Sequence, residues 1–337
     1  MAIPSRFRKS VFYFTMILMG FILIIVSLET FLQIRAWFLY RIQHKSFINQ
    51  VSCYVPSQDP ELLYEPRKNH VVNNIKVMQK DGGRFSDLIT EDKSPDEYRI
   101  VILGDSIASQ WAYPDQSNFG NHLLKTIHLE KTKKACLLNW SIHGYCTSQE
   151  YEMFSTVICK YKPDLLILEF CSNDLAPCGH PNEFLTSGFH FRIRLFNFLT
   201  YYFTPTMHVY KNQFLNRYTE DNCRKMFDAF ISLKELCDKN GTHLVIACFP
   251  FFNDNIYQDE KSFPEFHKFR KRLMQFWAEN GFLIIDLYKE FKKNLVVMDS
   301  LRLDKKDFIH ANQEGHRQIG DILGQKINEL LLKQNPM

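Results

Sequence analysis

Short apolar runs alternate with longer segments of helical pattern from about residue 96 to the end of the chain. Each run is continuous, without a polar residue at every second position, as is typical of strands covered on both faces. The runs predict five buried strands, at residues 99–103, 135–138, 165–170, 243–249 and 282–285.

Helical periodicity fills the intervals between these strands. One segment, 219–239, carries a single apolar face with spacings of three, formed by Phe227, Phe230, Leu233 and Leu236. Alternating strands and helices predict a five-stranded parallel sheet with helices on both faces, a three-layer α/β/α fold. Ligands bind such sheets outside the carboxyl ends of the strands. The helices are expected at 116–130, 148–161, 219–239, 262–280 and 312–333.

An uncharged apolar run of 18 residues, 11–28, follows Arg6, Arg8 and Lys9 near the N-terminus. As a helix it reaches about 27 Å, close to the hydrocarbon thickness of a bilayer. We interpret it as an uncleaved single-pass membrane anchor, because it is longer than a usual signal-peptide core and no small-x-small cleavage site follows; a cleaved signal peptide is the alternative. The basic residues before it favour a cytoplasmic N-terminus, with the bulk of the chain outside the cytoplasm.

These patterns divide the chain into three parts: a cytoplasmic tip and anchor (1–35), an irregular lead-in or stalk (36–95) and an α/β domain (96–337). The lead-in has no strong period and holds several prolines. Within the domain, residues 184–215 are rich in aromatic side chains and interrupt the alternation. An insertion helix packed on the domain is one interpretation, and a cap or a surface for a membrane or acyl chain is the other.

Composition narrows the function classes. A hydrophobic content of 45% is sufficient for a sizeable core, and a net charge of +4 gives no clustered basic footprint for nucleic acid. Gly82-Gly83 lacks the spaced glycines of a nucleotide-binding loop, so no cofactor is expected. The nine cysteines have no close pair at zinc-ligand spacing, so no metal site is expected either.

Residues suited to act as a nucleophile or to hold an oxyanion follow three of the predicted strands. Ser106 in Gly-Asp-Ser is placed as a nucleophile at a strand-to-helix turn, although a helix cap has the same sequence. Gly144 permits a close backbone approach and an N–H donor, or is simply a turn residue. Asn173 offers an amide to a developing oxyanion, or is ordinary turn chemistry.

A base and a carboxylate lie together before the last predicted helix. His310 can accept the serine proton, and a carboxylate is needed to orient it. Asp307, three residues earlier on the same predicted loop, can supply this carboxylate, and Asp304 competes with it for the role. His316 is assigned a packing or solvent role, since six residues put it on another helical face than His310.

The conjunction of these blocks resembles the GDSL/SGNH hydrolase family over roughly residues 96–330, and in particular bacterial members with an N-terminal anchor. The family's third block usually carries a glycine two residues before the aspartate-side position, where this chain has Ser172, and His143 is not a typical block residue. The amide donor is nevertheless in place. The matching blocks are Gly104-Asp105-Ser106, Gly144, Asn173 with Asp174, and Asp307 through His310.

The resemblance implies a flavodoxin-like SGNH fold and specific roles for these residues. Ser106 attacks an acyl carbonyl, His310 is the general base and Asp307 holds the imidazole. Asp307 is preferred to Asp304 because its three-residue spacing from His310 matches the family unit. The N–H groups of Ser106 and Gly144 and the Asn173 amide form the oxyanion hole, while Asp105 and Asp174 brace their loops.

Three functions agree with this reading. Hydrolysis of an acyl ester, such as deacetylation of a glycan or lipid, through an acyl-Ser106 intermediate is the leading one. O-acyl transfer to a cell-envelope glycan uses the same triad and is the alternative. A non-catalytic envelope scaffold that keeps the fold is a hypothesis of a different class.

Overall fold

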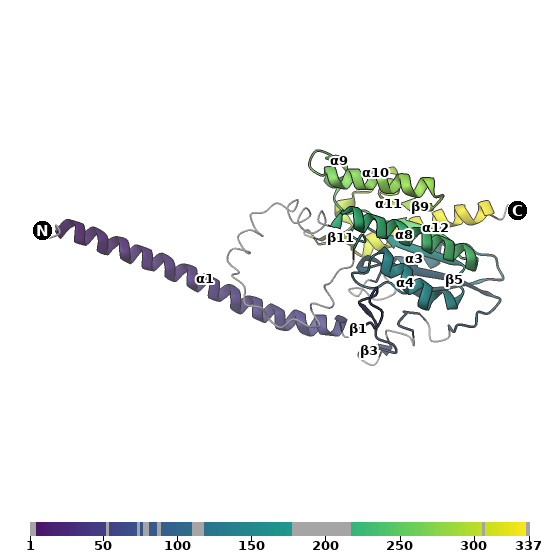
Figure 1. The fold of residues 1–337 in the computed structure, drawn as a ribbon, viewed down its shortest axis with the longest axis horizontal. Helices are drawn as coiled ribbons and strands as arrows, with labels where there is room; N and C mark the ends of the chain where they lie inside the picture. The colour runs from purple at the N-terminus through teal and green to yellow at the C-terminus, as the bar shows by residue number, and fades with distance from the viewer. Residues whose placement is uncertain are drawn as a thin grey trace. The chain divides into compact units, whose positions relative to one another are not determined.

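The computed structural model describes residues 5–51, 54–72, 75–76, 81–85, 89–109, 118–176, 217–304 and 307–334. The chain divides into two compact units, one containing residues 1–49 and 186–209 and the other residues 50–185 and 210–337. The second unit contains the sheet and the candidate site (Figure 1). The aromatic-rich segment 184–215 lies outside the described residues.

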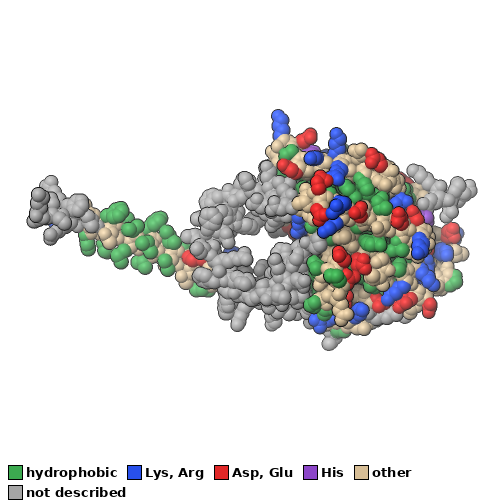
Figure 2. Space-filling view, in the orientation of Figure 1, with side chains coloured by type: hydrophobic (Ala, Val, Ile, Leu, Met, Phe, Trp, Pro, Cys, Tyr) green, Lys and Arg blue, Asp and Glu red, His purple; other side chains and the backbone are tan. Residues whose placement is uncertain are grey.

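Helix α1 (Ser5–Val51) carries the N-terminal apolar run. Its apolar span Phe12–Arg35 covers 24 residues with a mean hydropathy of 2.3, and little of it is buried. Apolar side chains follow one another along the described part of this helix (Figure 2). Among the described helices, α1 is the one that is long and apolar enough to cross a membrane, a test that an N-terminal signal sequence also passes.

The five predicted strands form one parallel sheet, which confirms the expected fold. The strand order is β6-β5-β7-β8-β9, so the second strand in the sequence lies at one edge and the first lies beside it. The strand order reverses at β5: the next strand in the sequence, β6, lies on one side of β5, and the later strands of the sheet follow on the other side, beginning with β7. The strands are β5 (Glu97–Leu103), β6 (Lys134–Asn139), β7 (Leu165–Phe170), β8 (His243–Cys248) and β9 (Leu283–Asp286).

Helices cover both faces of this sheet. On one face α4 packs against α8, and the rings of Phe227 in α8 and Phe276 in α10 stack 4.2 Å apart. On the other face α3 packs against α12 (Figure 1). The bounds are α3 (Phe119–Thr126), α4 (Thr147–Met153), α8 (Glu220–Asn240), α10 (Pro264–Glu279) and α12 (Gln313–Gln334).

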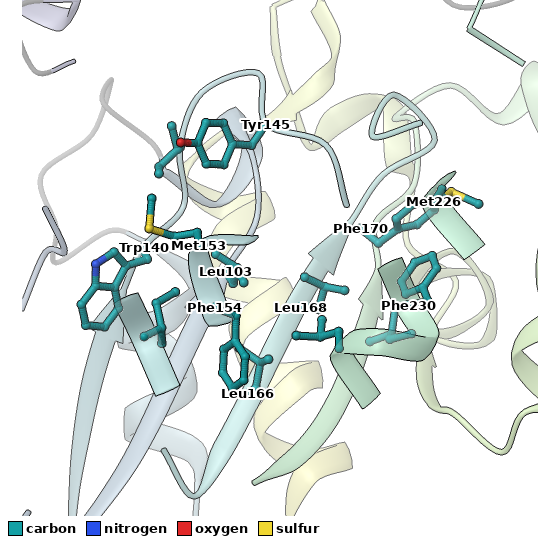
Figure 3. Packing of buried hydrophobic residues seen from close by; sticks show 14 of the residues in the cluster. Leu103, Trp140, Tyr145, Met153, Phe154, Leu166, Leu168, Phe170, Met226 and Phe230 are labelled. Carbon is teal, nitrogen blue, oxygen red and sulfur yellow. The ribbon is translucent and has the colours of Figure 1, made fainter. Parts of the chain in front are cut away.

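The continuous apolar strands explain the core. Every residue of β7 is buried, because helices cover it from both sides. On one face Phe170 of β7 lies 5.5 Å from the Phe230 ring of α8 (Figure 3). Burial of such aromatic side chains stabilises the domain by roughly 2–3 kcal/mol each.

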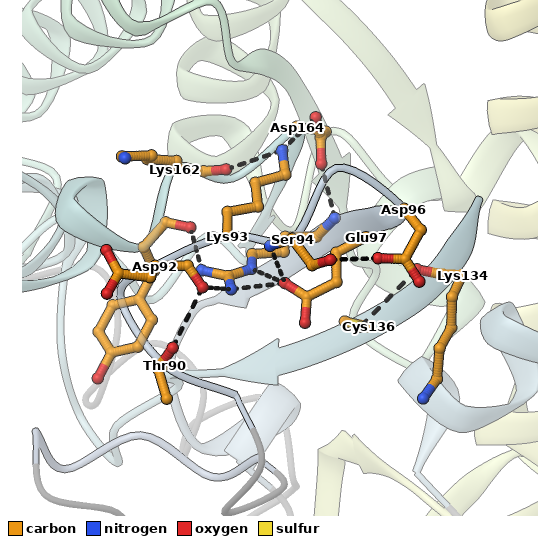
Figure 4. A network of polar contacts seen from close by, with 12 residues as sticks. Thr90, Asp92, Lys93, Ser94, Asp96, Glu97, Lys134, Cys136, Lys162 and Asp164 are labelled. Carbon is orange, nitrogen blue, oxygen red and sulfur yellow. Dashed lines mark hydrogen bonds and ion pairs between the residues drawn. The ribbon is translucent and has the colours of Figure 1, made fainter. Parts of the chain in front are cut away.

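A polar network joins the amino ends of the two central strands (Figure 4). The guanidinium of Arg99 is fully buried, pairs with Glu97 at 2.5 Å and donates to the carbonyl of Tyr161 at 2.7 Å. Asp164, which precedes β7, accepts the backbone N–H of Arg99 at 2.7 Å and pairs with Lys93. A buried arginine cannot give up its charge, so this satisfied network fixes the register of β5 against β7 at the end opposite the site.

Several short elements have no counterpart in the sequence pattern. They are α2 (Ser106–Ser109), α9 (Asp254–Gln258), α11 (Leu287–Lys293), the 3-10 turn Met298–Ser300, and the hairpins β3 (Val71–Val72) with β4 (Ile75–Lys76) and β10 (Arg302–Asp304) with β11 (Asp307–Ala311). The π-helical turn Phe154–Ile158 and the 3-10 turn Cys159–Tyr161 continue α4 to the end of the helix predicted at 148–161.

The lead-in differs from the expected stalk. The antiparallel hairpin β1 (Tyr54–Pro56) and β2 (Tyr64–Pro66) places Tyr54, Leu62 and Tyr64 in the hydrophobic core of the α/β domain, where each is at most 4% exposed. These apolar residues are too widely spaced to show a period, and their burial comes from contacts with distant residues. Part of the segment 36–95 therefore belongs to the domain.

Candidate active site

The strand β5 delivers Ser106 to the carboxyl edge of the sheet. The strand ends at Leu103 and the short helix α2 begins at Ser106 itself. Asp105 stabilises this turn by accepting the N–H of Ile107 at 2.7 Å. Gly104 is required by packing, because a Cβ there would lie 2.6 Å from a carboxyl oxygen of Glu169 on β7.

Ser106, His310 and Asp307 form one hydrogen-bonded chain. The Ser106 Oγ lies 2.9 Å from the His310 Nε2, and the His310 Nδ1 lies 2.8 Å from the Asp307 Oδ2. The structure therefore brings together the three residues expected to act as nucleophile, base and carboxylate. The competing carboxylate, Asp304, has a side chain that lies outside the described residues.

The histidine and the aspartate lie on a strand rather than on the loop predicted from the sequence. Strand β11 pairs antiparallel with β10 in a separate two-stranded sheet. The second carboxyl oxygen of Asp307, Oδ1, accepts the backbone N–H groups of Ile309 at 3.0 Å and His310 at 2.9 Å. This local bonding fixes the carboxylate and, through it, the imidazole.

The electrostatics suit a base that is held ready to accept a proton. Burial acts to lower the pKa of His310, but the hydrogen bond and charge of Asp307, together with the charge of Asp105, raise it above 6.5. For Asp307, burial acts to raise the pKa, but its bonds with His310 and two backbone N–H groups lower it below 3.8. The pair therefore favours an ionised aspartate and a more basic histidine.

Gly144 lies in a tight turn after β6. The N–H of Tyr145 donates to the carbonyl of Ile142 at 3.1 Å, and Gly144 has φ of +73° at the third position, as in a type II turn. The N–H of Ile142 donates to the carbonyl of Gly104 at 2.9 Å. This bond ties the turn to the strand end that carries the serine.

Asn173 follows β7, on the opposite side of β5 from the Gly144 turn. Its side-chain amide donates to Asp105 Oδ2 at 2.6 Å, and its backbone carbonyl accepts from the Arg217 guanidinium at 3.0 Å. Asp174 accepts the N–H of Cys171 at 2.7 Å. Asp105 and Asp174 thus brace their turns, as the sequence indicated, and Asp105 also links the turn of Ser106 to that of Asn173.

The site offers N–H groups for an oxyanion. The N–H of Ser106 begins a helix and has no carbonyl within it to bond. Among the described residues no acceptor takes the N–H of Ser106 or Gly144. An amide group has two hydrogens, so Asn173 retains one donor after its bond to Asp105. In the part of the chain that the structure describes, the three groups expected to donate to an oxyanion therefore each have an N–H free to donate.

Buried carboxyl groups beneath the serine were not predicted. Glu150 of α4 and Glu169 of β7 are both 0% exposed. Burial, and then neighbouring negative charge including that of Asp105, raises the pKa of each well above 4.5. Glu169 is the one charged residue in the apolar run LLILEF, and this was the available signal in the sequence.

Two further histidines lie near the site and stay neutral. Burial, and then the charges of nearby His122 and His310, lowers the pKa of His316 to about 3, and its ring stacks on Phe119. Burial, and then the charges of His310 and Arg84, lowers the pKa of His143 to about 3. The packing role expected for His316 agrees with its position. Within the described part of the chain, no three His, Cys, Asp or Glu side chains are grouped as metal ligands.

The chain belongs to the GDSL-like lipase/acylhydrolase family, whose model matches residues 102–318. It is similar in fold to the lipase/acylhydrolase from Enterococcus faecalis (15% identity, 69% of this chain and 96% of that chain, TM-score 0.41). It is also similar to a catalytic mutant of an acetylxylan esterase from Geobacillus stearothermophilus (12% identity, 71% and 95%, TM-score 0.43). A comparison with curated proteins gives no match.

Proposed function

We propose that the protein hydrolyses acyl esters through a covalent acyl-Ser106 intermediate. The observation that supports this most strongly is the unbroken hydrogen-bonded chain from Ser106 through His310 to Asp307, with distances of 2.9 and 2.8 Å. Membership of the lipase/acylhydrolase family supports the same reaction class. In such a chain the imidazole takes up the serine proton while the carboxylate stabilises the resulting imidazolium.

The reaction proceeds in two halves. The Ser106 Oγ attacks the carbonyl carbon as its proton passes to the His310 Nε2, and the carbonyl oxygen becomes an oxyanion. Collapse breaks the ester bond, and the leaving alcohol takes the proton from His310. Water then attacks the acyl-serine, with His310 as general base, and releases the carboxylic acid and free Ser106.

The oxyanion is held by backbone and side-chain donors. We assign this role to the N–H groups of Ser106 and Gly144 and to the Asn173 amide. Donors of this kind are fixed before the reaction and stabilise charge only as it develops, so they accelerate the chemical step rather than substrate binding.

We also propose that α1 anchors the enzyme in a membrane as a single pass, through the apolar residues 11–28. The span Phe12–Arg35 supports this by its length and hydropathy. Basic residues precede it in the sequence, which favours a cytoplasmic N-terminus and a catalytic domain on the other side. Carbonate extraction of membranes tests the anchor: the wild type stays in the pellet, and release into the supernatant would contradict it.

Labelling with a fluorophosphonate probe tests the activated serine. Membrane-extracted wild-type protein should be labelled, whereas Ser106→Ala and His310→Ala should not. Ser109→Ala is the matched control and should still be labelled. Ser109 is in the same short helix, but its hydroxyl donates to the backbone carbonyl of Ser106 and has no bond to His310. Absence of labelling in folded wild-type protein would overturn the assignment and favour a scaffold.

A second experiment separates hydrolysis from acyl transfer. Wild-type enzyme that has not been treated with the probe is given p-nitrophenyl acetate with and without an added glycan acceptor, and free acetate and acetylated glycan are measured. Hydrolysis predicts free acetate in both cases. Acetyl groups that accumulate on the glycan would instead establish an O-acyltransferase.

A further inference from the structure

Two tyrosines of the β1–β2 hairpin form hydrogen bonds with the turn that carries Gly144. The Tyr64 hydroxyl donates to the carbonyl of His143 at 2.5 Å, and the Tyr54 hydroxyl accepts the N–H of His143 at 3.2 Å. Both polar backbone groups of His143 are therefore bonded by phenols that are 79 and 89 residues away in the sequence.

One of these bonds acts directly on the proposed oxyanion donor. The carbonyl of His143 and the N–H of Gly144 belong to the same peptide group, which is planar, with C=O and N–H pointing in opposite directions. A bond that fixes the direction of the His143 carbonyl therefore fixes the direction of the Gly144 N–H. The carbonyl bond also polarises the peptide, which makes that N–H a stronger donor.

This peptide is the part of the turn that has an alternative orientation. It lies between the second and third residues of the type II turn Ile142–Tyr145, and type I and type II turns differ by a flip of that central peptide. A flip would turn the N–H of Gly144 away from its present direction. It would also break the bond between Tyr64 and His143, so the phenol opposes the flip.

The hairpin is held firmly enough for this task. Tyr54 is 3% exposed and Tyr64 is 0% exposed, and their rings meet edge to face with centroids 5.7 Å apart. The Tyr145 hydroxyl donates back to the carbonyl of Tyr64, and the Gln149 amide donates to the carbonyl of Leu62 at 2.8 Å. Buried hydrogen bonds in such a network are costly to break, since no water replaces them.

We propose that Tyr64, assisted by Tyr54, is a positioning residue that orients the His143–Gly144 peptide for oxyanion stabilisation. The inference rests on the proposed acyl-ester chemistry and adds to it a requirement for the segment that directly follows α1. The two hydroxyls bond the backbone of His143, so they act through the peptide.

Steady-state kinetics of Tyr64→Phe and Tyr54→Phe in the full chain test this positioning role, with p-nitrophenyl acetate as substrate. Each variant keeps the buried ring and loses only the hydroxyl. Tyr161→Phe is the matched control, because this tyrosine is equally buried but its hydroxyl bonds the Asp81 carboxylate. Melting temperatures are measured for all three variants.

Tyr64→Phe should lower kcat by roughly ten- to a hundredfold, because small misplacements of a catalytic group have large effects on rate. KM should stay within about twofold of wild type, since uniform binding is untouched. The pH at which activity falls on the acid side should be unchanged, because the bonds of His310 are intact. Tyr54→Phe should have a smaller effect in the same direction, and Tyr161→Phe should keep kcat within about twofold.

If the wild type is active and Tyr64→Phe is equally active, the positioning role of Tyr64 is overturned and the proposed function stands. An equal loss of kcat in Tyr161→Phe would also overturn that role, because it would show a general effect of lost core hydroxyls. If Tyr64→Phe does not fold, Tyr54→Phe decides by the same criteria. A folded wild type without esterase activity or fluorophosphonate labelling would instead overturn the proposed function, and the positioning role of Tyr64 with it.

Discussion

The serine half and the histidine half of the site are built differently. Ser106 and Asn173 follow neighbouring central strands, and their bracing carboxyls Asp105 and Asp174 are 1% exposed. The side chains of His310 and Asp307 are 32% and 28% exposed and lie on a small sheet of their own. One half takes its geometry from the core, and the other takes it from hydrogen bonds within three residues of sequence.

The two halves also treat carboxyl groups in opposite ways. On the serine side, burial raises the pKa of Glu150 and Glu169 and favours the neutral acid. On the histidine side, bonds from His310 and two backbone N–H groups outweigh burial and lower the pKa of Asp307. The surroundings thus favour the charged form of Asp307 in the histidine half and the neutral form of the carboxyl groups near Asp105 in the serine half.

Replacement of Asp307 by Asn should break the histidine half most severely. Asparagine has no charge, and if its one oxygen keeps the two backbone N–H groups, its NH2 faces the His310 Nδ1 in place of the acceptor Oδ2. The productive imidazole orientation is then disfavoured, and a loss of about 10⁴-fold in kcat is expected. Hydrolysis of p-nitrophenyl acetate gives the measurement. Asp299→Asn, an exposed carboxylate paired with Arg302, is the control. A loss smaller than tenfold would show that Asp307 does not orient the base.

Asn173→Ala should damage the serine half with a smaller effect. Loss of one oxyanion donor lowers kcat by about 10²–10³-fold with little change in KM. Kinetics of this variant should be compared with Asn280→Ala, which removes an exposed amide at the end of α10. If KM rose while kcat stayed constant, Asn173 would be a substrate-binding residue instead.

The pH profile of kcat/KM reports on the histidine half directly. His310 must be neutral to accept the serine proton, so activity is lost as the pH falls through its pKa, which lies above 6.5. Below that pKa the rate should fall about tenfold per pH unit. In Asp307→Asn the acid limb should move to lower pH, because burial then acts on the imidazole without the opposing charge. An unchanged limb would contradict this electrostatic assignment.

Glu150→Gln should give the smallest effect and sharpen the contrast in charge. The folded state raises the pKa of Glu150, so the folded protein holds a proton that the unfolded chain releases above about pH 4.5. Stability is therefore lost as the pH rises, and glutamine removes this loss. The melting temperature should increase by about 2–4 °C at pH 8 and little at pH 5. Glu279→Gln, at the exposed end of α10, should change neither, and a lower melting temperature at pH 8 for Glu150→Gln would refute the neutral carboxyl.

The sequence predicted the sheet well, because strands covered on both faces leave continuous apolar runs. All five predicted strands are present within a few residues of their expected ends. Long helices such as α8 were visible through their periodicity. The elements missed, including α2 and β11, have seven residues or fewer, too short to show a period.

The candidate site was accessible from the sequence only in part. The sequence pointed to the three residues of the hydrogen-bonded chain because of their positions. Ser106 follows a predicted strand, and His310 and Asp307 precede the last predicted helix. In a parallel sheet, ligands bind outside the carboxyl ends of the strands. Contacts made across long stretches of sequence could not be predicted. Neither Tyr64 at the carbonyl of His143 nor Glu169 beneath Asp105 has a partner that local pattern could reveal.

The β1–β2 hairpin also decides where the catalytic unit can be cut from its N-terminal helix. A protein shortened to begin at residue 96, where the regular pattern starts, would lose Tyr54, Leu62 and Tyr64 and leave Tyr145 without its buried partner. A protein that begins before Tyr54 retains them. Proteolytic shedding would follow the same boundary: cleavage at residues 52–53 would release an intact domain, and cleavage after Pro66 would release an incompletely packed one.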